Sequence, residues 1–196
     1  MKTSRSAPAV SALVTALCLL PAMAQAHPGH GGDFAAGVTH PFMGWDHLLA
    51  MLAVGLWAAQ LGGRARWAVP GAFVAVMSAG GAIGMAGFRL SLAEPAILTS
   101  VMLLGLMILT ACRMHLVGSI GLVSAFAFFH GLAHGAELPV NGNALLYTVG
   151  FALATATLHG IGLAAAGLTA KGLQTQIPLR FAGAAVAVGG AILTFR

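Results

Sequence analysis

Charged residues are scarce in this chain. They make up 7% of its 196 residues, and only 4 of them are Asp or Glu. A soluble domain carries roughly 25% charged residues, so this chain lacks the polar side chains that would cover a water-soluble core. Hydrophobic residues make up 59% of the sequence. The composition therefore predicts a protein whose solvent is membrane lipid.

Cysteine pairs, basic clusters and several catalytic motifs are also lacking. The two cysteines, Cys18 and Cys112, match neither a metal-ligand spacing nor a disulfide framework. The net charge is +5, but the nine basic residues are dispersed, which argues against binding of nucleic acid. No GxxxxGK[ST], GxSxG or HExxH pattern occurs. This excludes ATP hydrolysis by this chain and argues against an intramembrane hydrolase, so we expect no enzyme.

The first 26 residues are typical of a secretory signal peptide. They begin with Lys2 and Arg5, continue with an apolar stretch over 9–20, and end with the A-x-A cleavage signal Ala24-Gln25-Ala26. Cleavage would leave His27 as the mature N-terminus on the outer side of the membrane; the alternative is an uncleaved signal anchor. We therefore divide the chain into a signal peptide, 1–26, and a transmembrane domain, 27–196.

Six apolar segments follow the predicted signal peptide, at residues 38–61, 67–88, 94–112, 116–137, 144–167 and 178–195. Each suits the ~20 residues that cross ~30 Å of hydrocarbon as a helix. The sequence thus predicts an all-α membrane protein with six transmembrane helices. The first and fourth segments run antiparallel and both carry polar residues, which suits a 3+3 inverted repeat, although no internal sequence repeat is evident.

The loop charges indicate how these segments are oriented. With the mature N-terminus outside, the inner loops hold Arg64, Arg66, Arg113, Lys171 and Arg180, and the outer side holds Arg89 and Arg196. The larger number of basic residues in the inner loops agrees with the positive-inside rule. We expect a multi-pass protein of the bacterial inner membrane with a periplasmic mature N-terminus.

Histidines and acids inside the apolar segments are the strongest functional signal. A charged side chain near the bilayer centre costs roughly 2.5–3.5 kcal/mol on insertion scales, so each such residue needs a reason. In the fourth segment, His130, His134 and Glu137 are spaced i, i+4 and i+7 and form one stripe on a helix. Gly131 and Gly135 beside them would let another helix approach closely.

The first segment carries a second polar group, in HPFMGWDH at residues 40–47. On a straight helix His40 and His47 would lie about 10 Å apart along the axis, which is too far to share one metal ion. Either the helix is irregular at Pro41 and Gly44, or the two histidines serve successive sites. The depth of each residue in its segment predicts a cation path with two layers: an outer layer of His40, Glu94 and Glu137, and a lower layer of Asp46, His47, His130 and His134.

Imidazole and carboxylate ligands suit divalent first-row ions such as nickel, cobalt, zinc or copper(II). Met43 and Met51 would suit a copper(I) path, but most of the nine methionines are interpreted as packing residues. His27, with its free amine, and His30 would capture metal at the outer surface; the alternative is a plain flexible tail. The ion is expected as a transported substrate, and no resident cofactor is expected.

The two motifs together resemble the HupE/UreJ family of bacterial nickel permeases. The family pattern, close to HPxxGxDHxxAM, is matched by His40, Pro41, Gly44, Asp46, His47, Ala50 and Met51, and the second motif by His130, Gly131, His134, Gly135 and Glu137. The likeness covers essentially the whole mature chain. Larger nickel/cobalt transporters have four residues between His and Asp-His, whereas this chain has five between His40 and Asp46, which favours the smaller family.

The resemblance implies transport of nickel, with cobalt as the alternative ion, and a functional link to the maturation of nickel enzymes such as hydrogenase or urease. It implies metal handling by His40, Asp46, His47, His134 and Glu137, and less distinctively by Glu94.

Simpler interpretations remain for some of these residues. Glu94 precedes Pro95 at a helix start and is alternatively a plain N-terminal charge. His159 is alternatively an interhelical hydrogen-bond partner, and His115 an interfacial residue. A haem-binding electron carrier would also use facing histidines, but the neighbouring acids argue against it.

Overall fold

The computed structural model describes residues 34–137, 143–173 and 176–195, and this part of the chain consists of helices joined by short connections, without strands. The predicted signal peptide and the residues proposed to capture metal at the N-terminus, His27 and His30, lie outside the described residues. The all-α prediction is confirmed.

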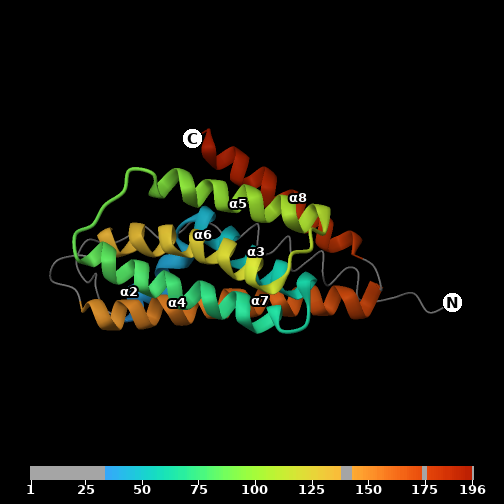
Figure 1. The fold of residues 1–196 in the computed structure, drawn as a ribbon, viewed down its shortest axis with the longest axis horizontal. Helices are drawn as coiled ribbons and strands as arrows, with labels where there is room; N and C mark the ends of the chain where they lie inside the picture. Colours follow the sequence, from blue (N-terminus) through green and yellow to red (C-terminus); the bar gives the residue numbers. More distant parts are fainter. Residues whose placement is uncertain (1–33, 138–142, 174–175, 196) are drawn as a thin grey trace.

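The long helices run side by side, and successive ones point in alternating directions (Figure 1). In chain order they are α2 (Phe34–Thr39), η1 (His40–Phe42), α3 (Trp45–Leu61), α4 (Ala65–Met85), α5 (Ala93–Thr110), α6 (Leu116–Glu137), α7 (Ala144–Leu173) and α8 (Ile177–Thr194). Five of these, α4 to α8, are long and apolar enough to cross a membrane, and a sixth span results if the bent pair formed by Phe34–Phe42 and Trp45–Leu61 is counted as one. The bounds of α6 coincide with the prediction, whereas α7 continues beyond the expected end at residue 167.

The first predicted segment, 38–61, is not one continuous helix. Its two parts meet at an angle of 83°. Pro41 lies in the 3-10 turn η1, and Gly44 is extended, with φ −108° and ψ 126°, before α3 begins. Proline lacks a backbone donor and glycine opposes helix continuation, so the pair ends one helical direction and permits another. Of the two alternatives for this segment, the irregular helix is correct.

Glycines allow the most extensive helix pairings, α4 with α6, α3 with α7, and α5 with α8. A Cβ atom on Gly131 of α6 would overlap the carbonyl oxygen of Met77 in α4, and one on Gly135 would overlap that of Gly81. Lipid offers no hydrophobic driving force between helices, so close backbone contact is a main source of their association. The expectation that Gly131 and Gly135 admit a neighbouring helix is confirmed.

Close contacts between glycines and neighbouring backbones also pack α7 against α3 and α2. Gly55 of α3 lies against the carbonyl of His159, and Gly162 of α7 against that of Leu52. Nearer the start of α7, Gly150 lies against the backbone of α2 at Phe34. These contacts fix the bent segment on α7, and with it the position of His40.

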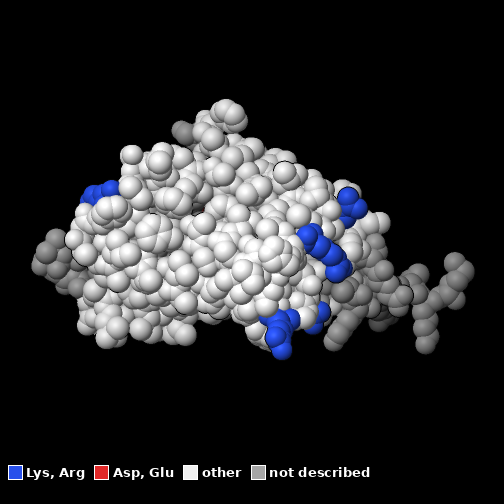
Figure 2. Space-filling view, viewed as in Figure 1, with Lys and Arg blue, Asp and Glu red and all other residues white. Residues whose placement is uncertain are grey.

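Basic residues gather at one end of the bundle. Arg64 and Arg66 begin α4, Arg113 lies between α5 and α6, and Arg180 lies in the first turn of α8. Arg89 lies at the other end, between α4 and α5. Figure 2 shows the basic side chains mainly toward one end of the visible face. The described loops therefore carry the charge asymmetry that the sequence predicts.

Candidate metal centre

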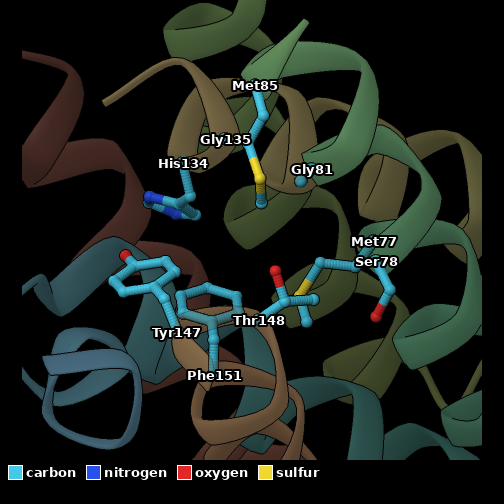
Figure 3. Close-up of a pocket in the computed structure, with 10 residues that line it drawn as sticks. Met77, Ser78, Gly81, Met85, His134, Gly135, Tyr147, Thr148 and Phe151 are labelled. Carbon is cyan, nitrogen blue, oxygen red and sulfur yellow. The ribbon is translucent and has the colours of Figure 1, made fainter. Parts of the chain in front are cut away.

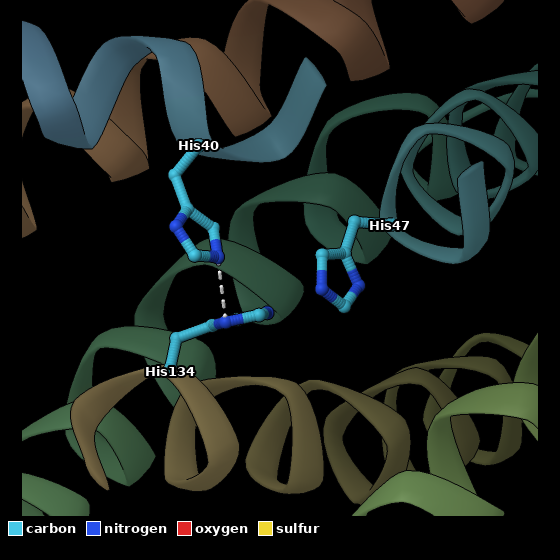
Figure 4. A group of neighbouring side chains, drawn as sticks. All are labelled: His40, His47 and His134. Atoms are coloured by element: carbon cyan, nitrogen blue, oxygen red, sulfur yellow. Dashed lines mark hydrogen bonds between the residues drawn. The ribbon is translucent and has the colours of Figure 1, made fainter. Parts of the chain in front are cut away.

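Three histidines from separate parts of the chain converge inside the bundle. His40 comes from η1, His47 from the first turn of α3 and His134 from the last turns of α6 (Figure 4). One ring nitrogen from each lies within 4.8 Å of the others. His47 and His134 are buried and His40 is half-buried. We refer to these residues as the three-histidine cluster.

The rings face a common point. A hydrogen bond of 2.9 Å joins Nε2 of His40 and Nδ1 of His134, and the centroids of the His47 and His134 rings are 4.2 Å apart. The rings of His40 and His47 are stacked with centroids 6.0 Å apart. Replacing the shared proton by a cation, with small ring rotations, would give three nitrogen ligands to one ion, a ligand set that suits nickel, copper or zinc.

The prediction of two layers is wrong for His40. On a straight helix His40 would lie above His47, but the 83° break folds η1 back toward the start of α3. His40 therefore shares the level of His47 and His134 and does not form a separate outer site.

Two carboxylates lie next to rings of the three-histidine cluster. Asp46 Oδ1 accepts a hydrogen bond of 2.9 Å from the backbone N–H of His47 and lies 3.5 Å from His47 Nδ1. Glu137 Oε2 lies 3.5 Å from His134 Nδ1. Carboxylates that contact ligating imidazoles orient the rings and raise their basicity. Asp46 is thus placed to orient the ring of His47, whereas Glu137 lies beside the His134 nitrogen that faces His40 and supplies negative charge there.

Glu94 lies in the first turn of α5 and is exposed. Asp46 lies at the start of α3 and Glu137 at the end of α6, so three of the chain's four acids lie at the same end of the bundle. This arrangement would raise the local concentration of cations at the mouth of the cluster. The structure brings Glu94 near the site without placing it among the histidine ligands.

His130 lies one turn deeper than His134 on α6 and is fully buried. Its Nδ1 is 3.0 Å from the carbonyl oxygen of Phe126, and its ring centroid is 5.7 Å from that of His47. His130 therefore borders the three-histidine cluster from below but is not one of its three members.

The cluster contains buried polar atoms that lack a hydrogen-bond partner. Within the described residues, His47 Nδ1 and His134 Nε2 make no hydrogen bond. Leaving such a group unpaired costs about 1–3 kcal/mol. A bound cation, or a water molecule that it brings, would satisfy nitrogens of this kind, which favours a binding role over a packing role.

Two aromatic residues that the sequence analysis missed form a wall of the site. The ring centroids of Tyr147 and Phe151 lie 5.9 and 5.6 Å from that of His40. They also line a cavity of about 20 Å³ beside His134, into which the ends of Met77 and Met85 project (Figure 3). About 10–15 Å³ suffices for one water molecule, so this space has the size of a single small ligand. The signal in the sequence was their spacing of four on α7, with Tyr147 as the sole tyrosine.

Comparison with known proteins identifies the family of the chain. Residues 15–193 match the family described as HupE / UreJ protein. The chain belongs to the HupE/UreJ family. It is 44% identical over 194 residues to Protein HupE of Rhizobium leguminosarum bv. viciae, covering 98% of each chain. No solved structure is significantly similar to the chain.

The HupE/UreJ family consists of membrane transport and accessory proteins and not of enzymes. Membership assigns this chain a nickel/cobalt transport-related role in general and links it to nickel supply for hydrogenase or urease. With its series of apolar helices, it is a multi-pass membrane protein.

Proposed function

We propose that this protein is a secondary transporter that imports Ni²⁺, with Co²⁺ as the alternative ion, across the bacterial inner membrane. The observation that carries the proposal is the convergence of His40, His47 and His134 within 4.8 Å in a lipid-embedded bundle. Such a cluster is costly to bury without a ligand, and imidazole nitrogen is a favoured ligand for these ions. The imported metal would supply the maturation of nickel enzymes.

The acids and the loop charges suggest the direction of transport. Asp46, Glu94 and Glu137 gather at the end of the bundle opposite Arg64, Arg66, Arg113 and Arg180. If the basic end faces the cytoplasm, the acidic end faces the periplasm and captures the ion there. The membrane potential then favours inward movement of a divalent cation by roughly 4.6 kcal/mol per 100 mV.

A site with three protein ligands, one of them partly exposed, suits a transporter that must also release the ion. His40 is only half-buried, whereas His47 and His134 are buried. A transport site must bind strongly enough to strip water and weakly enough to let the ion leave. We assign capture to the acids and the dehydrated binding step to the three histidines, with Asp46 orienting the ring of His47 and Glu137 supplying negative charge beside His134.

A haem-binding electron carrier has no structural observation in its favour. The cavity beside the histidines has about 20 Å³, whereas pockets for organic ligands have roughly 300–1,000 Å³. His40 and His134 also bond each other directly at 2.9 Å, which leaves no space for a porphyrin between them.

The mature N-terminus is proposed as an outer metal collector through His27 and His30. Replacing both histidines by alanine should reduce uptake at low external nickel and leave uptake at saturating nickel unchanged. Equal uptake by wild type and variant at low nickel would remove this part of the proposal.

Uptake of radioactive nickel by cells that express the full chain tests the transport function. We expect His47→Ala and His134→Ala each to lower the initial rate at least tenfold, because each removes one of three ligands. His115→Ala is the matched control, since His115 is exposed at the opposite end of α6. Membrane abundance of each variant is measured by immunoblot. If both cluster variants accumulate nickel like the wild type, the proposed function fails.

A further inference from the structure

A line of buried polar and sulfur-containing side chains continues inward from the three-histidine cluster. On α7, Tyr147, Phe151, Thr155 and His159 follow at intervals of four and share one face of the helix. The first two border the cluster, and the last two are at most 1% exposed. Thr155 and His159 therefore lie one and two turns deeper on the same line.

Thr155 differs from the other threonines of the bundle. Thr148, Thr157 and Thr169 each donate to a backbone carbonyl of their own helix, as is usual for threonine in a helix. The hydroxyl of Thr155 instead reaches Met51 Sδ at 3.4 Å and Met77 Sδ at 3.8 Å. Helices α3, α4 and α7 thus bring two thioethers together in the interior, where both methionines are almost completely buried.

His159 is one turn below this pair and has no hydrogen-bond partner for either ring nitrogen within the described residues. The alternative role of His159 as an interhelical hydrogen-bond partner is therefore wrong. Its ring meets the ring of Phe73 edge-on at 5.1 Å, and His130 lies against the same phenylalanine at 5.5 Å. Nε2 of His130 is unpartnered as well. Three unsatisfied imidazole nitrogens therefore belong to the two rings that contact Phe73.

Packing alone does not account for these side chains. Each unsatisfied buried nitrogen costs about 1–3 kcal/mol, and a leucine at either histidine would fill the same space without that cost. The group also mixes two imidazoles with two thioethers, and all four of these side chains can donate electrons to a metal. A proton pathway would explain the histidines but not the paired sulfur atoms, because a thioether does not carry protons at neutral pH.

We propose that His130, His159, Met51 and Met77 form a second, inner metal station, which the transported ion enters after it leaves the three-histidine cluster. This inference rests on the proposed function. Nitrogen and thioether ligands accept borderline ions such as Ni²⁺ and disfavour hard ions such as Mg²⁺, which prefer oxygen. The station would therefore add selectivity deep in the bundle, and a second site of moderate affinity would let the ion move on.

Binding of Ni²⁺ to the purified full chain in lipid nanodiscs, measured by equilibrium dialysis, tests this station. All variants carry His27→Ala and His30→Ala, which remove the proposed N-terminal collector; in this background we expect two ions per chain for the otherwise unchanged protein and for the control His115→Ala. His159→Gln and His134→Ala should each retain one ion, because each variant disables a different site. A background protein that binds one ion, lost in His134→Ala and kept in His159→Gln, overturns the inner station and leaves the proposed function intact.

A second variant tests the inner station even if the histidine variants do not fold. Met51→Leu/Met77→Leu keeps the volume of the core nearly constant but removes both sulfur atoms. At saturating nickel, X-ray absorption at the nickel edge should show sulfur scattering in the wild type and none in this double variant. Its uptake of nickel should fall at least fivefold and become more sensitive to excess Mg²⁺. Absence of sulfur scattering from the saturated wild type overturns the inner station, whereas normal uptake by His134→Ala would instead overturn the proposed function.

Discussion

The imidazole of His47 illustrates how individual side chains set the properties of the site. Its ring is buried, and the carboxylate of Asp46 accepts from its backbone N–H and lies 3.5 Å from Nδ1. The acid therefore fixes the first turn of α3 and the ring together. Residues of this kind act on affinity through a ligand, and their replacement typically costs 10–100-fold in metal affinity.

Two substitutions of Asp46 separate the effect of its charge from the effect of its hydrogen bond to the His47 backbone. Asp46→Asn retains an oxygen that can accept from the His47 backbone but removes the charge, so we expect the KM for nickel uptake to rise about tenfold. Asp46→Ala removes both the acceptor oxygen and the negative charge, so it should raise the KM further and lower the maximal rate of uptake. Kinetics of initial uptake over a range of nickel concentrations measure both quantities. A KM equal to that of the wild type in both variants would contradict a positioning role for Asp46.

Glu94 is a different case, because it is exposed and contacts no member of the cluster closely enough to orient it. Its effect should be electrostatic attraction of the ion, which salt screens. Glu94→Gln should therefore lower uptake about two- to fivefold at low ionic strength and have less effect at 0.5 M salt. If the loss of uptake is independent of salt, Glu94 acts as a ligand or a structural group instead.

Helix α6 shows how a single element combines packing and function. Its histidines face the site, and its glycines lie against the backbone of α4 at Met77 and Gly81. Because a helix backbone cannot yield as a flexible side chain does, a methyl group at Gly131 should force α6 away from α4. The same displacement would move His130 and His134.

Alanine substitutions within α6 provide a matched pair. Gly131→Ala should destabilise the protein by about 1–3 kcal/mol and reduce uptake. Gly121→Ala places a methyl group where nothing lies within 4 Å, so its stability should stay near or slightly above that of the wild type. Thermal unfolding of the purified proteins, followed by circular dichroism, measures the difference. Equal midpoints for the two variants would show that the close contact does not limit stability.

Some features of the helices could be predicted from the sequence, and others could not. The spacing of His130, His134 and Glu137 predicts the stripe on α6 because helical periodicity requires only local information. The break before α3 remained one of two alternatives, since Pro41 and Gly44 permit a bend but do not give its angle. The environment of His159 could not be predicted, because it depends on the contact of its ring with Phe73, which the packing of α4 against α7 creates.

At the level of the whole molecule, the polarity of the bundle underlies the proposed direction of transport. Four of the five described Arg residues lie at one end, whereas Asp46, Glu94 and Glu137 lie at the other end together with Arg89. The 3+3 inverted repeat stays a prediction. The main pairings, α3 with α7, α4 with α6 and α5 with α8, are compatible with an exchange of the two halves.

Thiol labelling in intact cells tests the orientation. In a chain without Cys112, Ser91→Cys in the connection between α4 and α5 should react with a membrane-impermeant maleimide. Gln176→Cys, which precedes α8 at the opposite end, should react only after the membrane is permeabilised. Both positions are exposed. The reverse pattern of labelling would place the acidic end in the cytoplasm and contradict import by this route.

The most direct test of the three-histidine cluster is a crystal structure of the nickel-loaded protein with anomalous data collected at the nickel edge. We expect an anomalous peak about 2 Å from ring nitrogens of His40, His47 and His134. A nickel peak found elsewhere in the bundle, with these three rings free of metal or turned toward lipid, would contradict it.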